Sequence, residues 1–136
     1  MAFLGMAECN AKGDVNVSKF KDRIAGCGGF INITQNTHKV VFCGTFTAKG
    51  LREEIRDGKL VITHEGAVQK FIDKVGQITF SAEYAHKHNQ QVMFITERCV
   101  FVLTDKGLVL TEIAPGVDLQ KDILTRWNSY RTSPKI

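Results

Sequence analysis

Three glycines in four positions mark the part of this sequence where a ligand could approach the backbone most closely. They are Gly26, Gly28 and Gly29, which flank Cys27 in the segment IAGCGGFINI, and the whole chain of 136 residues has only twelve glycines. Glycine reaches backbone conformations that other residues avoid, and it has no side chain to keep a ligand away. The cluster therefore predicts a tight turn, either with a ligand against its backbone or with none. Cys27 would be a nucleophile only if a helix N-terminus lowered the pKa of its thiol, and a small buried cysteine is the commoner case.

The cysteines and histidines give little support for a metal site. The four cysteines are Cys9, Cys27, Cys43 and Cys99. They are far apart and form no C-x-x-C or Cys/His pair with the spacing of zinc ligands, so reduced cytoplasmic thiols explain them better than disulfides. His86 and His88 are two residues apart, which places them on different faces of the helix predicted there. We therefore expect no bound metal.

Several short segments before residue 50 have the pattern of strands that could position the glycine cluster. AFLGM predicts a buried strand ahead of the turn residues in NAKGD, and VNVSKF predicts a second strand. HKVVFCGTF contains a continuous apolar run, which is typical of a strand covered on both faces in an α/β sheet. Between them, FINITQNT predicts a helix or an irregular turn.

From residue 51 the pattern becomes that of antiparallel strands. Asp57-Gly58 separates two extended segments and predicts a hairpin turn with positive φ. A short helix is expected at 82–88, and the strands VMFITE, CVFVLT and LVLTEIA follow it. Asp118 predicts the N-cap of a last helix, LQKDILTRW, whose apolar residues would pack on the sheet.

Composition and length favour a single globular α/β domain. The apolar fraction is 43%, the charged fraction is 24% and the net charge is +4. No apolar run reaches the ~18 residues of a membrane span, no basic block with interleaved aromatics argues for nucleic acid, and the first residues lack a secretion signal. We expect one domain at 1–126 with an open mixed sheet, flanking helices and antiparallel hairpins, and a frayed tail at 127–136.

The order of four segments resembles one enzyme family. FLGMAECNAKGDVNVSKF, IAGCGGFINI, HKVVFCGTFTAKG and ITERCVFVLTDKGLVLTEIAPGVDLQKDIL follow one another as in the C-terminal half of the family I coenzyme A transferases, the acetate or 3-ketoacid acyl-CoA enzymes. The resemblance runs from Phe3 to about Thr125. It implies an open α/β fold related to sugar-phosphate isomerase domains, with two such domains in each active unit.

The resemblance also implies a reaction, with coenzyme A as a substrate and no permanently bound cofactor. A glutamate attacks the acyl-CoA thioester, passes through an acyl-glutamyl anhydride to a glutamyl-CoA thioester, and then gives CoA to a second carboxylic acid. In the family the glycine turn lies beside this glutamate, and its backbone N–H groups stabilise the oxyanion. We carry this role to Gly28 and Gly29, with Gly26 and Cys27 shaping the turn against CoA.

Three other residues gain a possible role from the resemblance. Asn16 and Lys19, just before the turn, could reach a phosphate or the pantetheine amides of CoA, although an exposed loop lysine is an equally good interpretation. Glu97 in ITERCVF lies in a segment typical of the family. A structural ion pair of Glu97 with Arg98 or Lys106 explains it better than a nucleophile does.

The sequence also departs from the family pattern. In relatives the nucleophilic glutamate precedes the strand that corresponds to AFLGM, so we expect it, and the first of the two domains, outside this chain. The chain would then be a transferase part, truncated at its N-terminus, inactive alone and self-associating into a homo-oligomer through uncovered apolar surface. A domain that binds CoA or acyl-CoA without catalysis and an inactive, self-associating fragment stay open as alternatives. Acetate, propionate and 3-keto acids all fit as the short-chain carboxylic acid.

Overall fold

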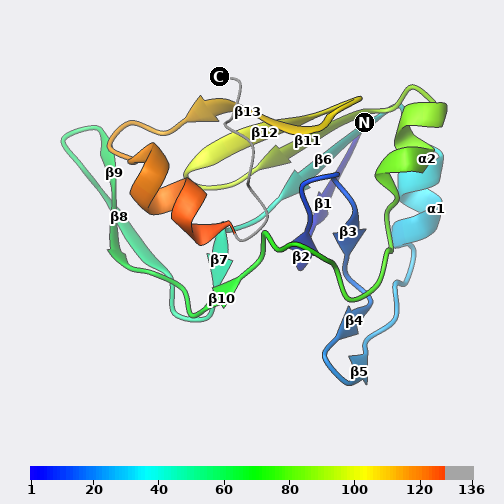
Figure 1. Cartoon of the computed structure of the whole chain (residues 1–136), viewed down its shortest axis with the longest axis horizontal. Coiled ribbons are helices and arrows are strands. Elements are labelled where there is room, and N and C mark those ends of the chain that lie inside the picture. The colour runs from blue at the N-terminus through cyan, green and yellow to red at the C-terminus, as the bar shows by residue number, and fades with distance from the viewer. Residues whose placement is uncertain (128–136) are drawn as a thin grey trace.

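A five-stranded mixed sheet organises the structure, a computed structural model that describes residues 1–127. The strands lie in the order β1-β6-β11-β12-β13 (Figure 1). Their bounds are β1 Ala2–Gly5, β6 Lys39–Cys43, β11 Gln91–Ile95, β12 Cys99–Thr104 and β13 Gly107–Ile113. The first three strands are parallel, and the last two continue the sheet in antiparallel fashion. The expected open mixed sheet is confirmed.

β6 lies inside the sheet between two parallel neighbours. Val40, Val41 and Phe42 are at most 3% exposed, as the continuous apolar run predicts. β1 is instead an edge strand, and its Phe3 is 66% exposed. The expectation of a buried strand at AFLGM is therefore wrong for one of its faces, because no described segment covers that side of the strand.

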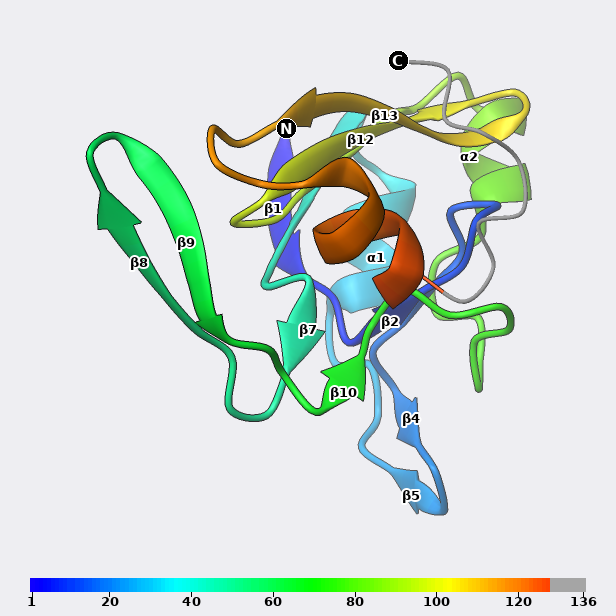
Figure 2. The same ribbon diagram turned by 60° about the vertical axis from the view of Figure 1, so that its left-hand side comes forward.

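The helices gather on one side of the sheet (Figure 2). They are α1 Phe30–Gln35, α2 Ala82–Lys87, a π turn at Leu119–Ile123 and a 3-10 turn at Leu124–Arg126. Ser81 caps α2, because its Oγ accepts a hydrogen bond from Tyr84 N at 3.2 Å. Asp118 caps the last two turns by accepting from Lys121 N at 2.7 Å. The predicted N-cap is confirmed, while the regular helix predicted after it is replaced by these two turns.

A two-stranded hairpin of β8 (Arg52–Arg56) and β9 (Lys59–His64) projects from the body of the protein (Figures 1 and 2). Asp57 has φ 51° and Gly58 has φ 75°, so both turn residues adopt the positive φ that a tight hairpin of this kind requires. The hairpin predicted from Asp57-Gly58 is confirmed.

Three pairs of two-residue strands complete the fold. β2 (Glu8–Cys9) pairs with β3 (Val15–Asn16), β4 (Lys19–Phe20) with β5 (Arg23–Ile24), and β7 (Thr47–Ala48) with β10 (Val68–Gln69). The segment VNVSKF therefore contributes to two short strands instead of the single strand expected.

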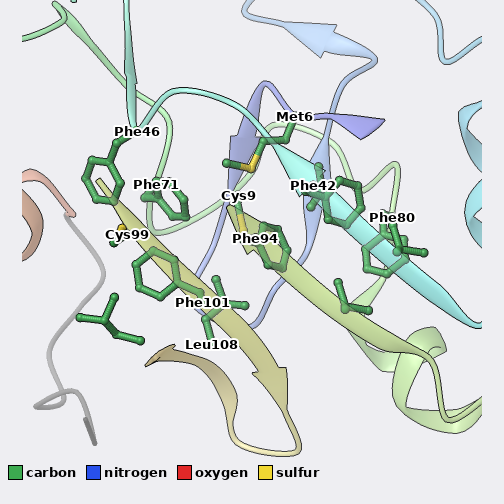
Figure 3. Packing of buried hydrophobic residues seen from close by; sticks show 14 of the residues in the cluster. Met6, Cys9, Phe42, Phe46, Phe71, Phe80, Phe94, Cys99, Phe101 and Leu108 are labelled. Carbon is green, nitrogen blue, oxygen red and sulfur yellow. The ribbon is translucent and has the colours of Figure 1, made fainter. Parts of the chain in front are cut away.

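Aromatic side chains fill the space between the sheet and the helices (Figure 3). The ring centroids of Phe42 and Phe94 are 5.0 Å apart, and those of Phe71 and Phe101 are 5.4 Å apart. Trp127 extends this cluster, with its ring 5.1 Å from that of Phe71 and only 3% of its surface exposed. The C-terminal turns are thereby tied to the core.

The expected boundary at residue 126 falls inside this packed region, since Trp127 belongs to the core. The rest of the expected tail, 128–136, lies outside the described residues. None of the described helices is long and apolar enough to cross a membrane.

Candidate functional site

The glycine cluster forms an exposed turn between β5 and α1. Gly26 and Gly28 have φ of 79° and 53°, in the left-handed region that favours glycine. Phe30 N donates to Cys27 O at 3.0 Å, which closes the turn, and α1 begins at Phe30. Gly29 takes the N-cap position of α1 with an ordinary φ of −83°. The sequence prediction of a tight turn at this point is confirmed.

Two backbone donors of this turn are open. The N–H groups of Gly28 and Gly29 have no acceptor among the described residues, and both glycines are exposed. A Cβ built on Gly28 would have no atom within 4 Å, and one on Gly29 would only make an ordinary 3.7 Å contact with Ile33 Cδ1. Either N–H group can therefore donate a hydrogen bond to an oxygen atom from outside the chain.

The topology places this turn at the carboxyl end of the parallel strands. α1 leads the chain back to the start of β6, so its own N-terminal end lies toward the end of β6. The Phe30 ring stacks at 5.9 Å on that of Phe42, the residue before the last of β6. In open α/β sheets, ligands bind outside the carboxyl ends of the strands. The glycine turn thus lies at the edge where a ligand is expected.

Ser18 anchors the start of the turn, and sequence analysis missed it. Its carbonyl accepts from Ala25 N at 2.8 Å and from Gly26 N at 3.3 Å. Its hydroxyl donates to Gln77 Oε1 at 2.7 Å, and the residue is only 7% exposed. Gln77 lies 59 residues from Ser18 in sequence, so no local pattern could have revealed this side-chain contact.

Asn16 serves the fold at the base of the site. Its Nδ2 donates to Glu8 Oε1 and to Lys19 O, both at 2.6 Å. Its Oδ1 accepts from Ser18 N at 3.0 Å and from Lys19 N at 3.1 Å. All four hydrogen-bonding positions of this fully buried amide are therefore filled within the chain, which leaves it no position for a ligand in this conformation.

Lys19 and Cys27 differ in their surroundings. Lys19 lies exposed on β4, next to Ser18 and thus close to the start of the glycine turn. Cys27 is half-buried and packs against the hydrophobic core. The structure therefore leaves the Lys19 ammonium available to a ligand and gives the Cys27 side chain a packing role.

Glu97 is held in an ion pair, as the simpler interpretation predicts. Its Oε1 accepts from Arg98 Nε at 2.6 Å, and its Oε2 accepts from Phe46 N at 2.8 Å. The partner is Arg98, and the exposed Lys106 forms no ion pair with it. With both oxygens engaged and 14% of its side chain exposed, Glu97 is poorly placed to attack a thioester.

Arg98 connects this carboxylate to a second one that sequence analysis missed. The guanidinium is fully buried and forms two bonds to Glu65, of 2.8 and 3.0 Å, and one to Asp122 O at 2.9 Å. Burial opposes the ionisation of Glu65, but the hydrogen bonds from Arg98 and Thr47 outweigh it and lower the pKa of Glu65 to about 2. Glu65 is 33 residues from Arg98 in sequence, so spacing gives no sign of the pair.

Lys70 is a further cation at the carboxyl end of β6, and nothing in its sequence context distinguishes it. It is only 8% exposed. Burial lowers the pKa of its ammonium, and the charge of Glu97 offsets part of that effect. A Cβ built on Gly44, the residue after β6, would lie 2.9 Å from Lys70 Nζ. The chain therefore holds a positive charge directly behind the end of this strand.

The contacts of His86 and His88 and the burial of Cys9 and Cys99 favour structural roles for these residues. His86 lies in α2, and the ring of His88 stacks at 3.9 Å on that of Tyr84, so the predicted surface helix is confirmed. All four cysteines are free thiols. Burial raises the pKa of the Cys99 thiol to about 12 and raises that of Cys9 as well. These two thiols are therefore kept in the unreactive, protonated form.

Comparison of the sequence with known proteins identifies CoA-transferases as relatives, although no family model matches the chain. The chain is 52% identical over 129 residues to the caffeate CoA-transferase of Acetobacterium woodii. The aligned region covers 91% of this chain and 24% of that protein. It is also 52% identical over 126 residues to the acetate CoA-transferase YdiF of Escherichia coli K12, covering 93% of this chain and 24% of the enzyme. The chain thus spans about a quarter of the length of these relatives.

Solved structures identify the same kind of relative as the sequence comparison. The acyl-CoA transferase YdiF apoenzyme of Escherichia coli O157:H7 superposes with a TM-score of 0.91 at 50% identity, over 97% of this chain and 25% of that one. A thioester complex of the same enzyme with CoA superposes equally well. A decarboxylase AibA/AibB variant, at 18% identity and a TM-score of 0.62, shares the fold alone. The predicted resemblance to CoA-transferases, in both sequence and fold, is confirmed.

Proposed function

We propose that this chain supplies one part of the active site of an acyl-CoA:carboxylate CoA-transferase. The observation that carries the proposal is the exposed glycine turn at the carboxyl end of the sheet, whose Gly28 and Gly29 N–H groups have no acceptor among the described residues. The turn lies in a chain half of whose residues are identical to those of CoA-transferases. Its role is to hold the oxyanion formed when the thioester is attacked.

The nucleophile comes from a segment outside this chain. A glutamate oxygen bonds to the acyl carbon, the C–S bond breaks, and CoA leaves as a thiolate, which gives an acyl-glutamyl anhydride. The thiolate then attacks the glutamyl carbonyl, releases the first carboxylic acid and leaves a glutamyl-CoA thioester. A second carboxylate then attacks the glutamyl-CoA carbonyl and expels the CoA thiolate, which gives a new acyl-glutamyl anhydride. The thiolate attacks the acyl carbonyl of this anhydride, which gives the second acyl-CoA and frees the glutamate carboxylate. At each attack the negative charge develops on a carbonyl oxygen, and a pair of backbone N–H groups stabilises it without side-chain rearrangement.

The two half-buried carboxylates Glu97 and Glu65 are engaged in hydrogen bonds within the chain. Glu97 accepts from Arg98 and Phe46, and Glu65 accepts from Arg98 and Thr47. An ion-paired carboxylate with a pKa near 2 is a weak nucleophile, which applies to Glu65. Their positions support a nucleophile that is supplied by another segment.

CoA contacts follow from the same placement. We assign a phosphate of CoA to the exposed Lys19, which follows Ser18, the residue that anchors the start of the glycine turn, and we assign the shape of the turn to Cys27 and Gly26. Asn16 acts indirectly, because its amide holds the backbone of Ser18 and Lys19. Acceptors would be short-chain carboxylic acids, and the four free thiols suit a cytoplasmic enzyme.

Intact mass spectrometry after incubation with acetyl-CoA tests the assignment of the nucleophile. Borohydride trapping and peptide mapping would locate any glutamyl-CoA adduct, first on the folded chain alone and then on its mixture with the part of YdiF that lies outside the matched region. We expect no adduct on this chain in either sample and an adduct on the YdiF part in the mixture. Glu97→Gln serves as a control and should behave as the unchanged chain does. An adduct on this chain would overturn the proposal.

A further inference from the structure

The Lys70 side chain is a buried cation that the proposed mechanism does not use. The residue is only 8% exposed. Its ammonium has three hydrogen-bond donors, yet within residues 1–127 it forms no hydrogen bond and no ion pair. A charge that is buried without a partner is costly to a folded protein. Packing of the core therefore does not explain a lysine at this position.

The carboxylate of Glu97 acts on Lys70 through its charge alone. Burial lowers the pKa of the Lys70 ammonium, and the negative charge of Glu97 offsets part of that effect. Both oxygens of Glu97 are already used, because Oε1 accepts from Arg98 Nε at 2.6 Å and Oε2 accepts from Phe46 N at 2.8 Å. The donors of the Lys70 ammonium are thus left free.

The tip of the Lys70 side chain reaches the surface although its stem is buried. Within the described residues, the side-chain polar atoms that lack a hydrogen bond and are sealed from solvent are Gln90 Oε1 and Arg126 Nε. Lys70 Nζ also lacks a hydrogen bond but is not one of these sealed atoms, so solvent touches it. Gly44, beside it, is half-buried and is followed by the exposed Thr45. A small ligand can therefore reach the ammonium.

The ammonium lies at the carboxyl ends of the parallel strands. A Cβ built on Gly44 would lie 2.9 Å from Lys70 Nζ and 4.0 Å from Met6 O. Gly44 follows β6 and Met6 follows β1, the parallel neighbour of β6. The glycine turn lies at the same edge of the sheet, where the Phe30 ring stacks on that of Phe42. Ligands of open α/β sheets bind at this edge.

Glycine at position 44 keeps the space beside the ammonium open. Gly44 is not one of the glycines with positive φ, so its backbone conformation does not require glycine. A side chain there would crowd Lys70 Nζ, since even its Cβ would come within 2.9 Å. The missing side chain and the unpartnered ammonium are two separate observations that point to the same vacant position for a ligand.

We propose that the Lys70 ammonium binds a carboxylate that takes part in CoA transfer. The inference rests on the proposed function, in which the acid substrate and the nucleophilic glutamate are both carboxylates. A compact ammonium acts as a point charge, and its hydrogen bonds to a carboxylate are short and strong. A single half-enclosed cation suits a small monoanion better than a phosphate of CoA, which carries more charge and more oxygen atoms.

Acetate binding by the chain alone tests the site without any transfer reaction. The side-chain NMR signals of isotope-labelled lysine are followed at pH 7 while sodium acetate replaces sodium chloride at constant ionic strength. Lys70→Met assigns the Lys70 signal, and the signal of Lys74, an exposed lysine four residues further on, is the internal control. A second titration uses inorganic phosphate. Gly44→Ala retains the lysine but fills the space beside its ammonium.

We expect acetate to shift the Lys70 signal saturably and to leave the Lys74 signal in place. Gly44→Ala should bind acetate at least about tenfold more weakly. A Lys70 signal that does not respond to about 100 mM acetate would overturn the inference. Phosphate that binds as tightly as acetate would also overturn it, because the site would then not be selective for carboxylates.

Kinetics of the chain mixed with the YdiF part distinguish the two sources of the carboxylate. If the acid substrate is the ligand, Lys70→Met should raise the KM for acetate at least about tenfold and change kcat little. If the nucleophilic glutamate is the ligand, Lys70→Met should instead slow formation of the glutamyl-CoA adduct at least about tenfold and leave this KM unchanged. Lys74→Met is the matched control and should behave as the unchanged chain does.

Thermal unfolding checks that each variant is folded, and Lys70→Met should keep its Tm because it removes a charge that no partner compensates. A folded Lys70→Met complex with unchanged KM and unchanged adduct formation would overturn the inference. Saturable binding of acetate at Lys70, with no CoA transfer in any mixture, would refute the proposed function and leave the carboxylate site standing.

Discussion

Among single residues, Gly28 and Gly29 differ in what the fold requires of them. Gly28 has φ 53°, where a residue with a side chain is strained by about 1–2 kcal/mol. Gly29 has φ −83°, and a Cβ there would make only an ordinary contact with Ile33. Folding therefore explains glycine at position 28 but not at position 29. The close approach of a ligand to the backbone gives a reason for the second glycine.

The variant Gly29→Ala separates these two reasons. We expect it to change the free energy of unfolding by no more than about 1 kcal/mol, the scale of an N-cap substitution. The added Cβ would stand where the thioester approaches, so the complex with the YdiF part should lose about 10²-fold or more in kcat, as for the loss of one oxyanion donor. Urea unfolding and the rate of CoA transfer measure the two effects.

Gly28→Ala is the companion variant, and it should lower both stability and activity. A Gly29→Ala complex as active as the unchanged one would show that the turn has no role in the reaction. A large loss of stability in Gly29→Ala would instead show that the backbone at this position is more demanding than its φ indicates.

At the scale of elements, Arg98 links three parts of the fold that are far apart in sequence. Glu65 follows β9, Glu97 follows β11, and Asp122 lies in the π turn near the C-terminal end. The Arg98 side chain bonds to all three and lies 5.0 Å above the Phe46 ring. Removing one member of such a buried pair leaves a charge uncompensated, at a cost of about 3–5 kcal/mol.

The ion pair of Arg98 with Glu65 makes the free energy of unfolding depend on pH in the acid range. The pKa of Glu65 is about 2 in the folded chain against an ordinary 4.5, so the folded state binds fewer protons than the unfolded state between these values. The stabilisation is complete above pH 4.5 and is lost as the pH falls toward 2, and its size is on the order of 3 kcal/mol. Urea unfolding of the unchanged chain and of Glu65→Gln from pH 7 to pH 2.5 measures it.

Glu65→Gln should be less stable at pH 7 and should lose less stability in acid than the unchanged chain. Glu83→Gln is the control, since Glu83 pairs with Lys87 on the surface of α2 with 78% of its side chain exposed. Exposed pairs of this kind contribute little to stability. Parallel acid profiles for Glu65→Gln and the unchanged chain would contradict the role given to the ion pair.

Sequence patterns predicted the elements that local chemistry determines. Asp57-Gly58 fixes a hairpin through backbone conformation, and Asp118 fixes the start of the last turns through one side-chain bond. Contacts between distant segments gave no such signal. The pairing of Glu65 with Arg98 joins residues 33 positions apart and depends on tertiary structure, which no local spacing encodes. The π turn after Asp118 ends at Ile123, whose side chain is buried in the same cluster as Trp127.

At the scale of the whole molecule, the helices of the described chain pack on one face of the sheet. The apolar run of β6 predicts a strand buried on both faces, and Val41 is only 3% exposed although the helices of the core lie on the opposite face of the sheet. Resemblance to CoA-transferases located the glycine turn, but the turn lies open at the edge of the sheet with Phe20 and Ile24 exposed beside it on β4 and β5. A closed active site would need further residues around this turn.

The exposure of the glycine turn predicts weak binding of CoA by the chain alone. Cavities of about 490, 260 and 220 Å³ are formed by described residues, and the glycine turn lines none of these three. A flexible ligand held only by exposed N–H groups and Lys19 loses more entropy than these contacts recover. In differential scanning fluorimetry with about 1 mM CoA, we expect the Tm of the chain to move by less than about 1 °C. A complex with the YdiF part that holds CoA at 100 times its Kd would gain about 2.7 kcal/mol, a shift of several degrees. A shift of that size in the chain alone, absent from Lys19→Ala, would instead identify a domain that binds CoA without a partner.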